Sequence, residues 1–288
     1  MTKTLFILLA SSFIGCTAPN SPSMVSVPTD NPNPDARVRV PTNHPNAMIP
    51  IPADHPTNTI HVLVALCDNK YQGIVPVPAA IGNGQNPAAN LYWGCAYGIK
   101  GFFGKSAQWQ LLKKYAIDST IMERLVFKHR QTGWYLVADA YNGQYIKQCT
   151  VDFFKSCAGM VKDTVQVSGT TIGSYGNARL LAYIGHDGLM DFSLTESYAN
   201  ADKKTRDAIM LACISKKYFA PHLQKTGANP LLWSTGLMAP EAYILHDALE
   251  SYLRKEPAAN IRSSAAKAYS RYQHCSIGAA TKLLVSGY

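Results

Sequence analysis

Two short apolar runs, each ending at a reactive side chain, constrain the fold more than any other feature of the sequence. Leu180–Ile184 and Ala208–Ala212 have the length and the continuous apolar character of strands that are buried on both faces. The first run leads into His186, within a Gly-His-Asp-Gly turn, and the second leads into Cys213. Because ligands collect beyond the carboxyl ends of the strands in an open α/β sheet, we expect the histidine and the cysteine to meet there as base and nucleophile.

The remaining apolar patterns indicate strands that alternate with helices. Further strands are predicted at Ile60–Leu66, Ile121–His129, Trp134–Ala140 and Pro230–Ser234. Helices are predicted at Leu91–Phe103, Gln144–Ala158, Lys216–Thr226 and Glu241–Arg254, with one or two more within Ser263–Ser286. This alternation predicts an α/β fold, a three-layer sandwich with a mostly parallel central sheet.

The first 15 residues have the features of an export signal. Lys3 supplies a positive start, and Leu5–Ile14 is an apolar core too short to span a bilayer. The segment ends in Phe13-Ile14-Gly15-Cys16, which resembles the lipobox of bacterial lipoproteins and implies cleavage before Cys16 and lipid on that residue. The resemblance, with Thr17 next, implies a lipoprotein anchored to the outer membrane, on its periplasmic or surface side. The alternative is an ordinary secretory signal with an incidental cysteine.

Residues 16–59 form a second, compositionally distinct segment. They are rich in Pro and Asn and contain a degenerate hexapeptide, seen at Val27–Pro32, Val40–Pro45 and Ile51–Pro56. Proline restricts the backbone and favours extended conformations, so this composition predicts a semi-rigid tether. The tether would hold residues 60–288, the single predicted folded domain, away from a membrane surface.

Charge and cysteine spacing limit the classes of partner and of cofactor. The net charge is +9, but the basic residues are scattered, so we do not expect a nucleic-acid-binding module. None of the seven cysteines forms a Cys-x-x-Cys pair or another zinc-ligand spacing. We therefore expect no structural metal site, and chemistry by a cysteine and a histidine would require neither a metal nor an organic cofactor. The pairing of the cysteines in disulfides stays open.

Three segments together resemble the caspase-like cysteine peptidases, the group of gingipain-type, legumain-type and clostripain-type enzymes. In that group one strand ends at a histidine beside a glycine, as in Tyr183-Ile184-Gly185-His186. The next core strand ends in a small residue and the nucleophilic cysteine, as in Leu211-Ala212-Cys213-Ile214-Ser215. Leu231-Leu232-Trp233-Ser234 resembles the strand that comes after the cysteine.

The resemblance implies thiol chemistry on a peptide or protein substrate. Cys213 would attack the acyl carbon, and His186 would act as general base and then as general acid. The oxyanion would be held by backbone N–H groups of Cys213 and of the residue after the histidine. The family has glycine after the histidine; this chain has Asp187 there and Gly188 one position later, so either is an oxyanion candidate.

Substrate recognition and catalytic competence each leave alternatives. Asp68 and Asp139 follow or end predicted strands and are candidates for binding a substrate side chain, or simply polar residues that close a strand. The sequence predicts a lipid-anchored cysteine peptidase or transpeptidase. The alternative is a catalytically silent caspase-like lipoprotein that serves as a binding or scaffold module in the envelope. A third possibility is a non-peptidase α/β hydrolase or binding protein.

Overall fold

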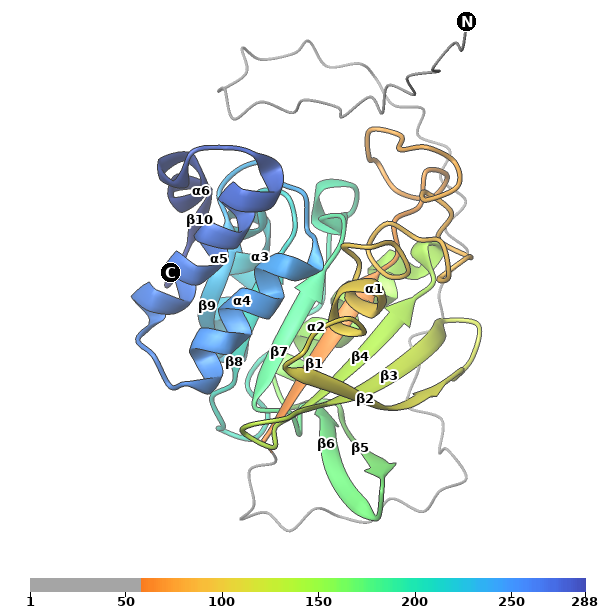
Figure 1. The fold of residues 1–288 in the computed structure, drawn as a ribbon, viewed down its shortest axis with the longest axis vertical. Coiled ribbons are helices and arrows are strands. Elements are labelled where there is room, and N and C mark those ends of the chain that lie inside the picture. Colours follow the sequence, from red (N-terminus) through yellow and green to blue (C-terminus); the bar gives the residue numbers. More distant parts are fainter. Residues whose placement is uncertain (1–57) are drawn as a thin grey trace, which may run out of the picture.

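The computed structural model describes residues 58–288, which are built around one eight-stranded sheet with helices packed on both of its faces (Figure 1). The strands run in the order β10-β9-β8-β7-β1-β4-β3-β2, and a separate hairpin consists of β5 and β6. The strands are β1 (Thr59–Ala65), β2 (Trp109–Tyr115), β3 (Ile121–His129), β4 (Tyr135–Tyr141), β5 (Lys162–Val167), β6 (Thr170–Tyr175), β7 (Leu180–Ile184), β8 (Asp207–Leu211), β9 (Asn229–Ser234) and β10 (Leu284–Val285).

Five neighbouring strands form the parallel centre of the sheet. β4, β1, β7, β8 and β9 all run in one direction, whereas β2, β3 and β10 pair antiparallel at the two edges. Every residue of β1 and of β7 is buried. This explains why the central strands appear in the sequence as continuous apolar runs, because a sheet covered on both faces has no polar side.

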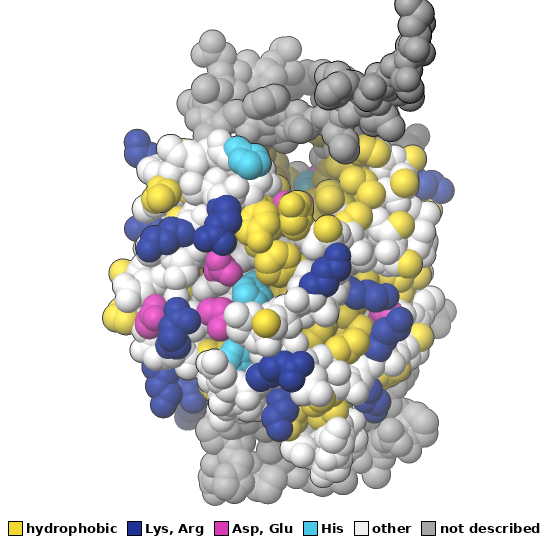
Figure 2. Space-filling model, viewed as in Figure 1, with side chains coloured by type: hydrophobic (Ala, Val, Ile, Leu, Met, Phe, Trp, Pro, Cys, Tyr) yellow, Lys and Arg dark blue, Asp and Glu magenta, His cyan; other side chains and the backbone are white. Residues whose placement is uncertain are grey.

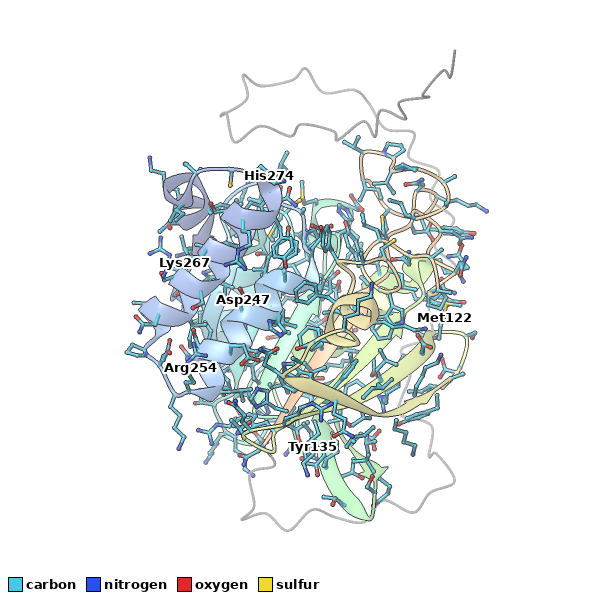
Figure 3. All side chains as sticks on the ribbon, in the orientation of Figure 1. Met122, Tyr135, Asp247, Arg254, Lys267 and His274 are labelled. Atoms are coloured by element: carbon cyan, nitrogen blue, oxygen red, sulfur yellow. The ribbon has the colours of Figure 1, made fainter. Side chains whose placement is uncertain are left out.

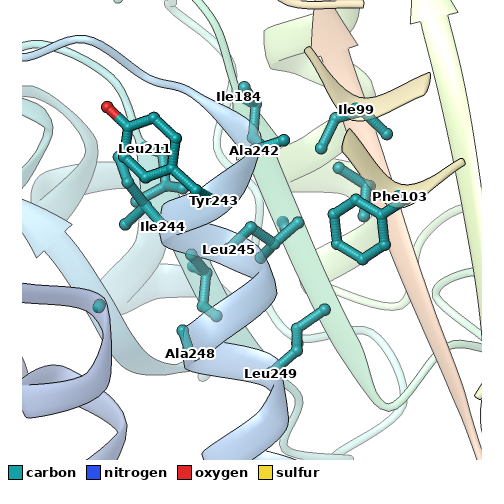
Figure 4. Close-up of a cluster of buried hydrophobic side chains, with 14 of the residues drawn as sticks. Ile99, Phe103, Ile184, Leu211, Ala242, Tyr243, Ile244, Leu245, Ala248 and Leu249 are labelled. Atoms are coloured by element: carbon teal, nitrogen blue, oxygen red, sulfur yellow. The ribbon is translucent and has the colours of Figure 1, made fainter. Parts of the chain in front are cut away.

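The helices are α1 (Ile99–Phe103), α2 (Ile146–Cys157), α3 (Ser215–Thr226), α4 (Ala242–Leu253), α5 (Ala258–Gln273) and α6 (Ile277–Leu283). Side chains of α1, α4 and α5 share one core with the sheet, and those of α2 and α3 share another. We call these the first and second faces. On the first face, Ala242, Leu245 and Leu249 of α4 lie against the sheet close to α1 (Figure 4). The predicted α/β fold with a mostly parallel central sheet is confirmed, and the arrangement is compatible with three layers.

The predicted helix at Leu91–Phe103 is wrong over most of its length. Only Ile99–Phe103 is helical, and the preceding residues form tight turns. The carbonyl oxygen of Asn90 accepts hydrogen bonds from three successive N–H groups, those of residues 93–95. A Cβ atom at Gly94 or at Gly98 would lie within 2.5 Å of neighbouring backbone atoms, so these glycines permit the chain to pack on itself.

Four strands are absent from the predicted set. β2 is an edge strand with mostly exposed or half-buried side chains, so it lacks the apolar run by which the central strands were identified. β5 and β6 are joined by Ser168 and Gly169, both with positive φ (49° and 76°), as in a tight hairpin turn. β10 has only two residues and pairs with β9. The C-terminal segment therefore contains two helices and this short strand.

A buried ionic cluster ties β1, β3 and β4 together. Asp139 has no exposed surface, and Arg124 donates to both of its carboxylate oxygens, at 2.6 and 2.7 Å. His61 donates from Nε2 to the same carboxylate at 3.0 Å and accepts the Tyr175 N–H at Nδ1. Although burial alone would raise it, Arg124 and His61 hold the pKa of Asp139 well below its ordinary value.

The signal and most of the tether lie outside the described residues, and β1 begins at Thr59, the last residue of the predicted tether. Among residues 58–288, no helix combines the length and the apolar character needed to cross a bilayer. On the face seen in Figure 2, the Lys and Arg side chains are dispersed around hydrophobic side chains near the middle.

Removing the cation of the buried cluster tests its contribution to stability. We expect Arg124→Met to lower the free energy of unfolding by about 3–5 kcal/mol, because Asp139 is then a buried carboxylate without its main partner. Denaturant unfolding of the two proteins measures the difference. Arg130→Met, at an exposed position after β3, is the matched control and should change stability by less than about 0.5 kcal/mol. Equal losses in the two variants would contradict the assigned role of the cluster.

Candidate functional site

The histidine and the cysteine lie at neighbouring strand ends. β7 and β8 are adjacent and parallel, and their register pairs Ile184 with Leu211. His186 and Cys213 each follow two residues later, at the same edge of the sheet. The pairing of β7 with β8 therefore places the two residues on neighbouring strand ends.

The direction in which the chain continues reverses beside them. After β1 the chain leads to β4 on one side of the sheet, and after β7 it leads to β8 on the other. The loops that follow β1 and β7 thus leave in opposite directions, which is the arrangement that opens a ligand crevice at the carboxyl edge. Gly185 lies at this point with a φ of 145°, and a Cβ there would lie 2.6 Å from the carbonyl oxygen of Ala65 in β1. Only glycine permits this close approach of the two strand ends.

His186 is held by a carboxylate that the sequence motifs do not identify. Its Nε2 lies 2.8 Å from Oδ2 of Asp191, and the imidazole is almost fully buried. Burial acts to raise the pKa of Asp191, but the hydrogen bonds from His186 and from the Gly73 N–H outweigh it and lower that pKa. The ionised carboxylate only accepts, so Nε2 carries a proton and donates it to Asp191. Nδ1 is then the nitrogen that is left to exchange a proton, as a general base requires.

Asp191 follows a short 3₁₀ turn, η2 (Gly188–Met190), five residues after the histidine. No recognised motif joins a histidine to an aspartate at this spacing, so the sequence does not identify Asp191, which lies in a polar connecting loop, as a partner of His186. The η2 turn is what brings the two side chains together.

The Cys213 thiol is mostly buried and engages a loop beyond β9. Sγ lies 3.5 Å from the carbonyl oxygen of Met238 and 3.4 Å from its N–H. Burial raises the pKa of the thiol, the Met238 N–H lowers it, and the Asp187 carboxylate raises it further, so the net pKa is above the ordinary value. In this state the cysteine is a neutral thiol at pH 7, and its chemistry requires a base.

A strained turn presents the cysteine. Ile214 has a φ of 49°, a left-handed conformation that a β-branched residue rarely adopts, and it is followed at once by α3. Its N–H donates to the carbonyl oxygen of Gly236. Two hydrogen bonds between Ser215 and Ser234 support the turn: the Ser215 N–H donates to Oγ of Ser234 at 3.2 Å, and the Ser234 N–H donates to Oγ of Ser215 at 2.9 Å. The serine two residues after the cysteine therefore has a structural role in fixing the turn.

Both oxyanion candidates lie at this edge. Asp187 is fully buried, and its Oδ1 accepts the N–H of Leu189 at 3.0 Å, which caps η2. Burial raises the pKa of Asp187 to about 7, with a smaller contribution from Asp191. Within the described residues, the N–H groups of Asp187 and Cys213 donate to no backbone carbonyl. A Cβ at Gly188 would lie 2.7 Å from the Phe192 ring.

The two predicted substrate-binding aspartates are engaged in structural contacts. Asp68 is buried; its Oδ1 accepts the N–H groups of Lys70 and Tyr71, and its Oδ2 accepts Gln85 at 2.6 Å. It organises the loop after β1. Asp139 lies within β4, in the buried cluster with Arg124. All four carboxylate oxygens accept hydrogen bonds in these structural contacts, so neither residue is left free to bind a substrate side chain.

Metal-ligand clusters and disulfides were sought among the described residues. Among residues 58–288, no three His, Cys, Asp or Glu side chains are grouped so as to hold a metal ion. No disulfide joins the six cysteines found there. Cys149 and Cys157 lie on α2, as the sequence predicts, and both are buried.

Comparisons of the chain with protein-family models, with curated proteins and with solved structures found no match.

The glycine before the histidine offers a test of the geometry of the strand ends. We expect Gly185→Ala to lower the free energy of unfolding by about 3 kcal/mol, from backbone strain and from the contact with Ala65. Gly133→Ala is the matched control, because Gly133 also has a positive φ (74°) but has nothing within 4 Å of the position of a Cβ. It should cost about 1 kcal/mol. Chemical denaturation measures both, and indistinguishable losses would show that the close approach of β1 and β7 is unimportant.

Proposed function

We propose that this protein is a cysteine peptidase or transpeptidase of the caspase-like group, acting on peptide bonds by acyl transfer through Cys213. One observation carries the proposal: Cys213 and His186 follow consecutive, adjacent, parallel strands in register, and His186 is already oriented by Asp191. Nucleophile, base and orienting carboxylate are the three parts of an activated thiol site.

Acyl transfer at this site would require these side chains, two backbone N–H groups, and a water molecule or a second amine. Nδ1 of His186 takes the thiol proton, and Sγ of Cys213 forms a bond to the acyl carbon while the carbonyl electron pair moves to oxygen. Backbone N–H groups of Cys213 and Asp187 stabilise the oxyanion. The tetrahedral intermediate expels the amine, which takes the proton from His186. The thioester is then cleaved by water or by a second amine, giving hydrolysis or transpeptidation.

The order of parts supports the caspase-like assignment. The histidine strand, the cysteine strand, the next strand and its following helix are β7, β8, β9 and α4, and the three strands are neighbours in the sheet. The chain departs from the family at Asp187, where a glycine is expected. The assignment therefore rests on arrangement and on two short motifs.

A second candidate function is a catalytically silent binding module. The raised pKa of Cys213 and its two contacts with Met238 favour it, because a neutral, hydrogen-bonded thiol is a poor nucleophile. In this reading the crevice would bind a peptide without cleaving it. Acylation of the Cys213 thiol is expected of the enzyme and not of the silent module, so it distinguishes the two functions.

We also propose that the protein is held at the outer membrane by lipid on Cys16. The lipobox-like segment and the proline-rich residues after it support this placement. The peptide substrate would then be a component of the cell envelope.

A thiol-acylating probe tests the enzymatic proposal. With peptide-level mass spectrometry as the readout, we expect wild type to be acylated at Cys213, and Cys213→Ala to lose that modification completely. His186→Ala should slow acylation of Cys213 by about 10²- to 10⁴-fold, the usual contribution of a general base.

Matched controls exist for both residues. Cys275→Ala removes another half-buried cysteine. His246→Ala removes a buried histidine that is likewise paired with an aspartate, Asp247, on α4 (Figure 3). Both controls should be acylated at Cys213 at the wild-type rate. Equal rates in His186→Ala and wild type would overturn the proposed chemistry.

Asp191 should affect the rate of acylation and not the affinity for the probe. We expect Asp191→Asn to lower the maximal acylation rate by roughly 10- to 100-fold, because an ionised carboxylate no longer fixes the tautomer and the orientation of His186. The probe concentration that gives the half-maximal rate should be unchanged. Asp247→Asn, which alters the other histidine–aspartate pair, should leave both quantities unchanged. A change confined to the half-maximal concentration would assign Asp191 to binding instead.

A further inference from the structure

One carboxylate oxygen at the site has no partner. Asp187 follows His186 directly and has no exposed surface. Its Oδ1 caps η2 through Leu189, but its Oδ2 is buried and makes no hydrogen bond with any described residue. A buried ionised oxygen without a partner is strongly unfavourable, whereas a protonated carboxyl has an O–H that can donate.

The surroundings favour the neutral form. The titratable groups that interact electrostatically with Asp187 are Asp191 from its own turn, Tyr183 from β7 and Cys213 after β8. Tyr183 donates its hydroxyl to the His186 carbonyl oxygen. From α2, the apolar Ile146 packs near this turn. Within the described residues, no lysine or arginine contributes to the pKa of Asp187, which burial and the Asp191 carboxylate raise to about 7.

We propose that Asp187 is a further catalytic residue of the site: its neutral carboxyl donates a hydrogen bond to the substrate oxygen on which negative charge develops, so the site works with Asp187 protonated. This inference rests on the proposed function. It is carried by the partnerless Oδ2 of Asp187, on a residue that follows β7 and interacts electrostatically with the Cys213 thiol after the neighbouring strand β8. The proton stays on Asp187 throughout, so the balance of the acyl-transfer step is unchanged.

The ionised form would oppose the same reaction. A carboxylate beside the thiol disfavours formation of the thiolate, and it also repels the oxyanion. A carboxylic acid that is kept neutral in a buried site is an effective oxyanion donor. The aspartate thus replaces the glycine of the related peptidases with a donor that is available only below its pKa.

Two substitutions separate donation from ionisation. Asp187→Asn keeps an oxygen that can cap η2 and an N–H₂ that can donate, but it does not ionise. Asp187→Gly removes both the charge and the side-chain donor. The rate of Cys213 acylation is measured from pH 5 to 9 on the full chain, with peptide-level mass spectrometry. Iodoacetamide, which is attacked at carbon without forming an oxyanion, reports the thiol alone.

If the inference holds, the ratio of the Asn variant's acylation rate to that of wild type rises by about tenfold per pH unit above pH 7. The corresponding ratio for iodoacetamide changes much less. The Gly variant should be acylated about 10²-fold more slowly than the Asn variant, the usual effect of losing one oxyanion donor.

The outcomes distinguish this inference from the proposed function. Three outcomes would overturn the role of Asp187 and leave the proposed function standing. They are acylation whose Asn-to-wild-type rate ratio does not change with pH, pH effects that are equal for the two probes, and equal acylation rates in the Asn and Gly variants. Alkylation of Cys213 by iodoacetamide without acylation at any pH, in all three proteins, would overturn the proposed function and this role with it.

Discussion

The parallel hydrogen-bond ladder of β4, β1, β7, β8 and β9 is the constraint on which the rest of the structure depends. Parallel pairing sends every connection back across a face, so helices cover both faces and the strands become apolar throughout. It also brings all five carboxyl ends to one edge. His186 and Cys213, which follow β7 and β8, lie at the same edge of the sheet for this reason.

Burial at this edge has opposite effects on its ionisable groups. Asp191 has hydrogen-bond donors and is stabilised as an anion, whereas Asp187 and Cys213 lack compensating charge and are shifted toward their neutral forms. Neighbouring groups with their pKa values driven apart are typical of acid–base sites. The same physics gives the silent-module alternative its support, because a thiol that is held neutral is inert until a base removes its proton.

The sequence predicts the central strands well, because burial on both faces leaves an uninterrupted apolar run such as Leu180–Ile184. Elements stabilised by tertiary contacts leave no such pattern: β2 is an exposed edge, and β10 exists only through its pairing with β9. The same distinction applies to the site. His186 and Cys213 are found because each ends a recognisable strand, whereas Asp191 reaches the histidine only through the fold of η2. Asp139 shows the opposite error: its place near a strand end suggested a binding residue, but it is paired with the buried Arg124, and no spacing in the sequence reveals that partner.

The shared acceptor at Asp191 links the loop after β1 to His186. Its Oδ2 receives both the His186 Nε2–H and the N–H of Gly73, in the long loop after β1. Loss of the Gly73 contact would leave the imidazole as the one donor of the two to that oxygen. A rearrangement of the loop would therefore alter the hydrogen bonding of His186 through a single atom, without any change in the strands.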